Sequence, residues 1–180
     1  SGTERLAEAA AQLGLGTEDI VVNLQGDEPL MPPSLLQQVA GVLEGEHGAD
    51  MSTLCCRIHT AAELFDPHVV KVVMDSLGNA LYFSRAVIPW DRDAFAVTTG
   101  KLPEQALHYR HLGVYAYRVG FLESYVTKEP CELERMESLE QLRVLWHGGR
   151  IHVAEAEQLP GPGVDTAEDL ERVRELFARQ

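Results

Sequence analysis

The sequence contains little cysteine and no arrangement that would pair it. Of its three cysteines, Cys55 and Cys56 are adjacent and Cys131 is distant. Domains that rely on disulfides usually carry an even set of spaced cysteines, and many metal sites carry a CxxC pair. The sequence therefore favours a reducing compartment, and we expect a cytoplasmic protein.

Positive charge is also scarce. The chain has 15 lysines and arginines against 28 aspartates and glutamates, which gives a formal net charge of -13. Proteins that bind nucleic acids or anionic membrane surfaces need lysine and arginine to displace counterions, so the charge balance argues against both partners. A small anionic ligand remains compatible with it, because a metal ion can screen the charge of the ligand.

Long apolar runs and several catalytic signatures are missing as well. No run approaches membrane-spanning length, and we expect no signal peptide. The sequence has no G-x-S-x-G elbow, Walker phosphate loop, dinucleotide fingerprint or zinc spacing of His and Cys. Serine-hydrolase, P-loop and dehydrogenase functions therefore lack their core residues.

What is present is an alternation of helical and strand patterns. A chain of 180 residues with 45% hydrophobic and 24% charged residues predicts one domain over residues 1–180. The alternation is typical of an α/β protein, and the turn at 76–79 predicts a hairpin. We predict a mixed, mostly parallel sheet with helices on both faces and this antiparallel hairpin inserted. Helices are expected at 1–13, 33–44, 132–146 and 166–178, and strands at 19–25, 51–58, 69–75, 80–85, 109–118 and 150–156.

An acidic loop follows the first strand, in the stretch VVNLQGDEPL. In open α/β sheets, ligands bind beyond the carboxyl ends of strands, and Asp27 is expected there. Gly26 permits a close approach, and a carboxylate in this position suits Mg²⁺, which prefers hard oxygen ligands. The same residues also fit an ordinary turn in which Asp27 caps the following segment.

A second acidic loop, PGPGVDTAEDL, precedes the last helix and contains Asp165. Thr166 and Asp169 fit a capping box, so Asp165 also has a purely structural interpretation as a residue of the helix start. If both loops meet above the sheet, Asp27 and Asp165 would bind one divalent ion between them. The helix after this loop is expected to turn Leu170, Val173 and Phe177 toward the core.

Polar residues that periodicity does not require lie between these loops. His111 and Tyr115 are four apart in the strand RHLGVYAYR, so they share a face, and Gly113 leaves that face open. A half-buried aromatic face with a satisfied histidine is the simpler interpretation. Glu140 and Gln141 flank the apolar stripe of the expected helix 132–146, where they either line a pocket or face solvent.

Arg85 ends a predicted strand, as Asp27 does, in YFSRAVIPWDRD. Its planar guanidinium group is suited to an anionic ligand. The alternative is a surface ion pair with one of the many carboxylates.

Six ordered blocks resemble one family. SGTER, NLQGDEPL, YFSRAVIPWDRD, RHLGVYAYR, LEQLRVLW and GVDTAEDLERVR resemble the 3-deoxy-manno-octulosonate cytidylyltransferases, or CMP-Kdo synthetases, from Ser1 to about Arg174. The resemblance implies a Rossmann-like nucleotide-diphospho-sugar transferase fold, usually dimeric. It implies transfer of CMP from CTP to the acid sugar Kdo with Mg²⁺, release of pyrophosphate, and a role in lipopolysaccharide synthesis.

The resemblance also implies roles for particular residues. It places the metal on Asp27 and Asp165, which would make them catalytic. It places a segment near the nucleotide at Ser1, Gly2 and Thr3. Around the sugar acid it places Gln25, Arg85, His111, Tyr115, Glu140 and Gln141.

One part of the family pattern is missing before Ser1. Members carry an N-terminal strand and a loop with glycine, arginine and lysine that wraps the triphosphate, and this sequence does not contain them. We therefore expect an incomplete domain that is inactive and poorly stable by itself, with a sheet edge and apolar surface exposed.

Two other functions remain open. The chain would fit a cytidylyltransferase that uses another acidic sugar, such as a sialic acid. It would also fit a non-catalytic scaffold that kept the fold and lost the phosphate loop. A carboxylate-pair hydrolase is a weaker alternative, because Asp27 and Asp165 suit a metal better than acid and base roles across a glycosidic bond.

Overall fold

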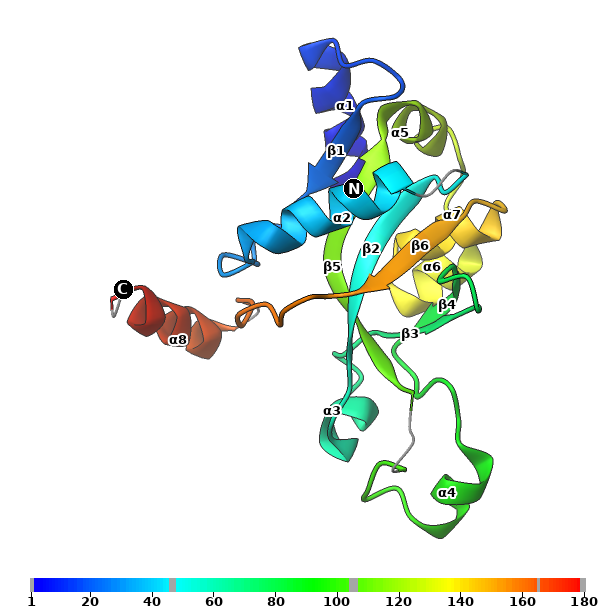
Figure 1. Cartoon of the computed structure of the whole chain (residues 1–180), viewed down its shortest axis with the longest axis vertical. Helices are drawn as coiled ribbons and strands as arrows, with labels where there is room; N and C mark the ends of the chain where they lie inside the picture. Colours follow the sequence, from blue (N-terminus) through cyan, green and yellow to red (C-terminus); the bar gives the residue numbers. More distant parts are fainter. Residues whose placement is uncertain (1, 46–47, 104–106, 165, 179–180) are drawn as a thin grey trace.

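The computed structural model describes residues 2–45, 48–103, 107–164 and 166–178. A sheet with the order β4-β3-β5-β2-β6 runs through its centre, and β1 pairs with β5 outside this path (Figure 1). The strands are β1 (Ile20–Asn23), β2 (Met51–Arg57), β3 (Lys71–Met74), β4 (Ala80–Ser84), β5 (Tyr109–Arg118) and β6 (Ile151–Glu155). Each strand lies within one of the ranges that the sequence predicts, and the bounds of β5 are those predicted.

The directions of the strands correct one prediction. The sheet is mixed, as predicted, and β3 and β4 form the expected antiparallel hairpin. The long strand β5, however, runs antiparallel to β1, β2 and β3. Among the paired strands of the described residues, β2 and β6 are the parallel pair. The prediction of a mostly parallel sheet is therefore wrong, because one central antiparallel strand contributes most of the pairings.

Helices cover both faces of the sheet, as predicted (Figure 1). On one face, α2 buries Leu35, Val39 and Leu43, which are spaced one turn apart and 0% exposed, against Leu54 and Val114 of the sheet. The other face carries a larger cluster that includes α5 and α7, with α1 packed against it. The helices on these faces are α1 (Gly2–Leu13), α2 (Pro33–Gly45), α5 (Val119–Tyr125), α6 (Glu132–Glu137) and α7 (Gln141–Trp146).

The expected helix 132–146 is two helices. Ser138 adopts a left-handed conformation with φ 54°, and the amides of Ser138 and Leu139 both donate to the carbonyl of Glu134, which ends α6. A left-handed serine is disfavoured by its Cβ, so sequence patterns do not predict it. The break places Glu140 at the N-terminal cap of α7 instead of on a helix face.

Three further helices complete the described chain, and sequence patterns missed two of them. The short helices α3 (Ala61–Phe65) and α4 (Arg92–Val97) enclose a small core of Ile58, Leu64 and Phe95. The helix α8 (Ala167–Phe177) has the predicted capping box between Thr166 and Asp169. Figure 1 shows α8 standing away from the sheet at the end of a long segment.

The position of α8 corrects the prediction for its apolar residues. Val173 is buried, whereas Leu170 is 39% and Phe177 50% exposed. The two exposed residues have the predicted spacing but not the predicted burial, because α8 lies beyond the sheet that would cover them.

The cysteines agree with the expectation of no disulfide. Cys55, Cys56 and Cys131 are free and buried, and burial raises the pKa of the Cys55 thiol to about 12. No helix within the described ranges has the length and apolar character needed to cross a membrane.

Candidate active site

A cavity of about 1110 Å³ opens beside the strand β5. Its walls come from the start of α1, the loop after β1, the end of β4, the face of β5 and the turn between α6 and α7. These segments are far apart in the sequence, and the fold alone brings them together. The cavity is lined by eight of the predicted residues, Gly2, Thr3, Gln25, Arg85, His111, Tyr115, Glu140 and Gln141. Ser1 and Asp165 lie outside the described residues.

The face of β5 presents His111 and Tyr115 together. In a regular strand, residues four apart are separated by about 13 Å along the strand. Strand β5 is not regular at this point. Thr53 of β2 pairs with Tyr115, but the next residue, Leu54, pairs with Leu112, so the register between the two strands shifts by two residues. This bulge keeps both side chains on one face and brings their ring centroids to 5.2 Å.

Gln25 reaches over this bulge from the loop after β1. A Cβ atom placed on Gly113 would lie 3.6 Å from Gln25 Nε2, in ordinary contact. The space beside Gly113 is therefore taken by the amide of Gln25, and the face that the sequence predicts to be open is covered there by this side chain.

His111 is a neutral imidazole at physiological pH. Burial lowers the pKa of His111 to about 3, because the charged ring would lose its hydration. The ring also packs edge-on against Phe83, with centroids 5.0 Å apart and an interplanar angle of 80°. A neutral ring has one hydrogen-bond donor and one acceptor nitrogen.

We expect His111 to make the protein sensitive to acid. Between pH 6.5 and 3, the unfolded state binds a proton at this histidine that the folded state does not bind, so stability rises with pH and is lost as pH falls. The loss is at most about 1.4 kcal/mol per pH unit. His111→Gln removes this contribution. Urea unfolding of both proteins at pH about 7.5, 6 and 5 measures it, and equal pH slopes would contradict it.

Phenol groups on the same side of the sheet also stay neutral. Burial raises the pKa of Tyr115 and of Tyr117 above the usual range, although the neighbouring side chains of Thr3 and Asn23 act to lower the pKa of Tyr117. Neutral phenols both donate and accept hydrogen bonds. This wall of the cavity therefore suits a ligand that is rich in hydroxyl groups.

Glu140 links the start of α1 to the start of α7. Thr3 Oγ1 donates to Glu140 Oε2 over 3.0 Å, and Tyr125 donates to the Glu140 carbonyl over 3.3 Å. Gln141 follows directly and is 6% exposed. The break between α6 and α7 thus places a carboxylate and an amide at the cavity, which a continuous helix would not do.

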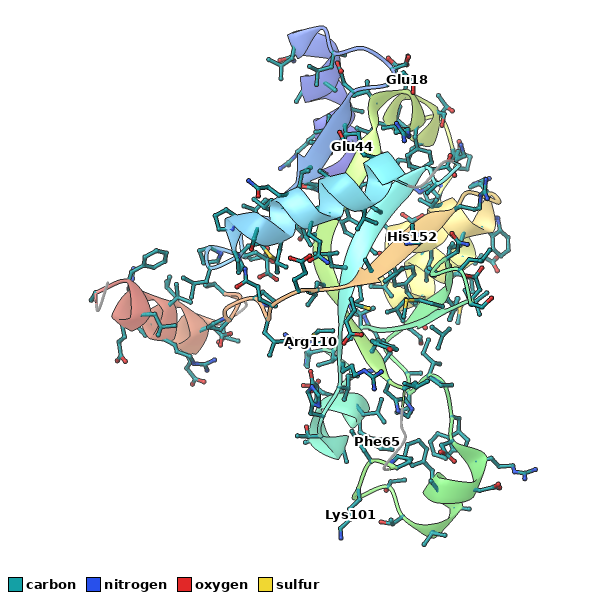
Figure 2. All side chains as sticks on the ribbon, viewed as in Figure 1. Glu18, Glu44, Phe65, Lys101, Arg110 and His152 are labelled. Atoms are coloured by element: carbon teal, nitrogen blue, oxygen red, sulfur yellow. The ribbon has the colours of Figure 1, made fainter. Side chains whose placement is uncertain are left out.

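Arg85 follows the end of β4 and is held by backbone carbonyls. Its Nε donates to the carbonyl of Glu137 over 2.7 Å, and its Nη1 donates to the carbonyl of Pro67 over 3.2 Å. The sequence also allows a surface ion pair for Arg85, but among the described residues its guanidinium is bonded to these neutral carbonyls, while the Glu137 carboxylate accepts from its backbone amide over 2.9 Å. Arg110 on β5, which is labelled in Figure 2, also lines the cavity, but it pairs with Glu63 at 3.6 Å.

The two acidic loops lie against each other. The amide of Val164 donates to the carbonyl of Asp27 over 2.8 Å, and the amide of Gly161 donates to that of Leu30 over 3.3 Å. A Cβ on Gly161 would lie 2.5 Å from the Cβ of Leu30, so glycine permits this approach.

Asp27 itself is at the rim of the site. It is exposed, and the described residues that line the cavity include its neighbours Gly26 and Glu28 but not Asp27. Within the described ranges, no group of three or more His, Cys, Asp or Glu side chains is arranged to hold a metal. The assignment of a metal to Asp27 and Asp165 therefore stays a prediction.

Comparison with known proteins identifies the family. A family model described as cytidylyltransferase matches residues 1–151. A 3-deoxy-manno-octulosonate cytidylyltransferase of Pseudomonas fluorescens strain Pf-5 is 61% identical over 177 residues, which are 98% of this chain and 70% of the relative. The chain belongs to the 3-deoxy-manno-octulosonate cytidylyltransferases.

Other cytidylyltransferases agree with this assignment. A relative of the same name from Idiomarina loihiensis is 53% identical over 98% of this chain and 70% of its own length. A solved structure of CMP:2-keto-3-deoxy-manno-octonic acid synthetase complexed with CTP has a TM-score of 0.87 and 40% identity, covering 99% of this chain and 68% of that one. A 4-diphosphocytidyl-2C-methyl-D-erythritol synthase, at 11% identity and a TM-score of 0.55, shares the fold.

Sequence reasoning missed two residues that support the site of this cytidylyltransferase. Lys71 is 0% exposed, and its Nζ donates to the carbonyls of Asp66, Val69 and Arg85 over 2.9, 2.6 and 2.6 Å. It holds the segment before β3 against the residue that follows β4, and desolvation lowers its pKa. The sequence signal that could have indicated a buried lysine is its position inside the apolar run VVKVV. The second residue is Thr53, a neighbour of His111.

Proposed function

We propose that this cytidylyltransferase transfers CMP from CTP to 3-deoxy-manno-octulosonate and releases pyrophosphate. The observation that carries the proposal is the 61% identity to the Pseudomonas fluorescens relative over 98% of the chain. The polar wall of the cavity and the guanidinium of Arg85, which is held by backbone carbonyls, support it, because the sugar has several hydroxyl groups and a carboxylate.

In this proposal the sugar hydroxyl attacks the α-phosphorus of CTP, and the residues of the cavity align it. Arg85 binds the carboxylate of the sugar, for which its guanidinium geometry is suited. Gln25, Tyr115, Glu140 and Gln141 bind hydroxyl groups. Alignment alone contributes about 7 kcal/mol or more in favourable cases, so these residues accelerate the reaction as aligners, whichever group takes the proton that the attacking hydroxyl loses.

The start of α1 is proposed to lie near the nucleotide. Gly2 and Thr3 line the cavity, and the free amides at a helix N-terminus favour anions such as phosphates. The hydroxyl of Thr3 donates to Glu140. In this proposal, Thr3 connects the nucleotide side of the cavity to the sugar side.

Mg²⁺ is proposed to bind to Asp27 and Asp165. The donor set fits this ion, since Asp27 offers an exposed carboxylate and the loop that leads to Asp165 is hydrogen-bonded to Asp27 through Val164. When bound, Mg²⁺ would stabilise negative charge on phosphate oxygens.

Assembly, compartment and pathway are further proposals that follow from the family resemblance. We propose a cytoplasmic homodimer whose product serves lipopolysaccharide synthesis. Light scattering of the protein during size-exclusion chromatography tests the dimer, which a monomer mass at all concentrations would contradict.

Pyrophosphate release in the presence of CTP and Mg²⁺ tests the activity. Kdo and a sialic acid are compared as acceptors, with this chain and with a chain extended upstream of Ser1 by the loop segment that the family resemblance predicts. We expect release with Kdo in the extended chain. Release with the sialic acid alone would assign the other acidic sugar, and no release with either acceptor would favour the non-catalytic scaffold.

A further inference from the structure

Thr53 lies beneath the cavity and its hydroxyl contacts three polar atoms. The residue is on β2, opposite Tyr115 at the bulge, and is 0% exposed. Thr53 Oγ1 lies 2.7 Å from the carbonyl oxygen of Val114, 3.2 Å from that of Leu112 and 2.9 Å from His111 Nε2. Both carbonyl oxygens can accept a hydrogen bond from the Thr53 hydroxyl.

The number of protons decides the direction of each bond. A threonine hydroxyl has one proton, and a carbonyl oxygen only accepts. The short contact to Val114 therefore uses the proton of Thr53, and toward His111 the hydroxyl oxygen is the acceptor. Nε2 of His111 must then carry the hydrogen of the ring.

We propose that Thr53 is a positioning residue that fixes His111 as its Nε2–H tautomer, so that Nδ1 accepts a hydrogen bond from a hydroxyl group of the sugar. The second part rests on the proposed function. His111 lines the cavity and its Nε2 is already engaged below, which leaves Nδ1 as the acceptor nitrogen for a ligand. The low pKa of His111 agrees with an aligning acceptor and not with a base that removes the proton.

The tautomer is measured without any substrate. Two-bond correlation of ring protons and nitrogens by NMR, with ¹⁵N-labelled histidine, distinguishes Nε2–H from Nδ1–H, and His111→Gln identifies the signals. We expect Nε2–H in the wild-type protein and in Thr53→Ser, which keeps the hydroxyl, and a mixed or Nδ1–H ring in Thr53→Val. Nε2–H retained in Thr53→Val, or Nδ1–H in the wild-type protein, would overturn the proposal.

Ser52→Ala is the matched control. Ser52 is equally buried on the same strand, and its hydroxyl donates to the carbonyl of Val39 over 2.7 Å. We expect this variant to lose a buried hydroxyl and to keep the wild-type tautomer. A shift of the tautomer in Ser52→Ala would mean that general loosening of β2 causes the change, and would overturn the assignment to Thr53.

The role of Nδ1 is tested by kinetics in the protein that shows CMP transfer. Loss of one acceptor should raise KM for the sugar about tenfold in Thr53→Val, leave KM for CTP unchanged, and be rescued in Thr53→Ser. An equal rise for both substrates would contradict the role of Nδ1. Since the NMR measurement needs no substrate, a failure of the proposed function and a failure of the tautomer assignment are distinguishable.

Discussion

Asp27→Asn is expected to lower kcat/KM for CMP transfer by at least about 100-fold, because an amide replaces a proposed charged ligand of Mg²⁺ at nearly constant shape. The exposed position of Asp27 and the backbone contacts of its loop leave the fold unaffected. Pyrophosphate release by the chain extended upstream of Ser1, across a range of Mg²⁺ concentrations, measures the effect. The Mg²⁺ concentration for half-maximal activity should rise together with the loss of rate.

Glu44→Gln provides the control for the loss of one negative charge. Glu44 is exposed on α2 (Figure 2), and the described residues that line the cavity do not include it. This variant should keep the wild-type rate and Mg²⁺ dependence. If Asp27→Asn behaves in the same way, Asp27 is not a metal ligand, and its role is the turn that the sequence also allows.

Glu134→Gln is expected to lower the free energy of unfolding by about 3 kcal/mol, because it leaves the charge of Arg143 buried without its counterion. Arg143 Nε donates to Glu134 Oε2 over 2.7 Å and Nη2 to Oε1 over 2.5 Å, a bidentate pair in which Glu134 is 9% and Arg143 4% exposed. The guanidinium carbon also lies 4.8 Å from the centre of the Tyr125 ring. Urea unfolding measures the change.

Two variants show which part of this effect comes from burial. The exposed pair of Glu171 and Arg174 has side chains that are 67% and 64% exposed, and Glu171→Gln should cost less than about 1 kcal/mol. The double variant Glu134→Leu with Arg143→Met removes both buried charges and should recover most of the stability. Equal losses in Glu134→Gln and Glu171→Gln would contradict the argument.

The ion pair also connects stability to the site. It joins α6 to α7 across the turn that contains Ser138, Leu139 and Glu140. Removal of the pair should therefore disturb Glu140 and Gln141, and Glu134→Gln should raise KM for the sugar in addition to its effect on unfolding.

Much of the fold follows from local patterns in the sequence. The bounds of β5, the hairpin of β3 and β4, and the capping box of Thr166 and Asp169 each depend on residues that are close along the chain. Alternation, turn residues and caps act over a few positions, so the sequence by itself determines them. The same holds for the acidic loops at the ends of predicted strands.

Only the tertiary structure decided the direction of the strands, the break before Glu140 and the burial on α8. Alternation of side chains is the same in parallel and antiparallel strands, so it does not report that β5 opposes its neighbours. The left-handed Ser138 has no local signal, and Val173 and Phe177 differ in burial although both belong to one apolar stripe. Thr53 and Lys71 belong to the site through contacts with residues distant in sequence, since a hydrogen bond depends on distance in space and not on spacing along the chain.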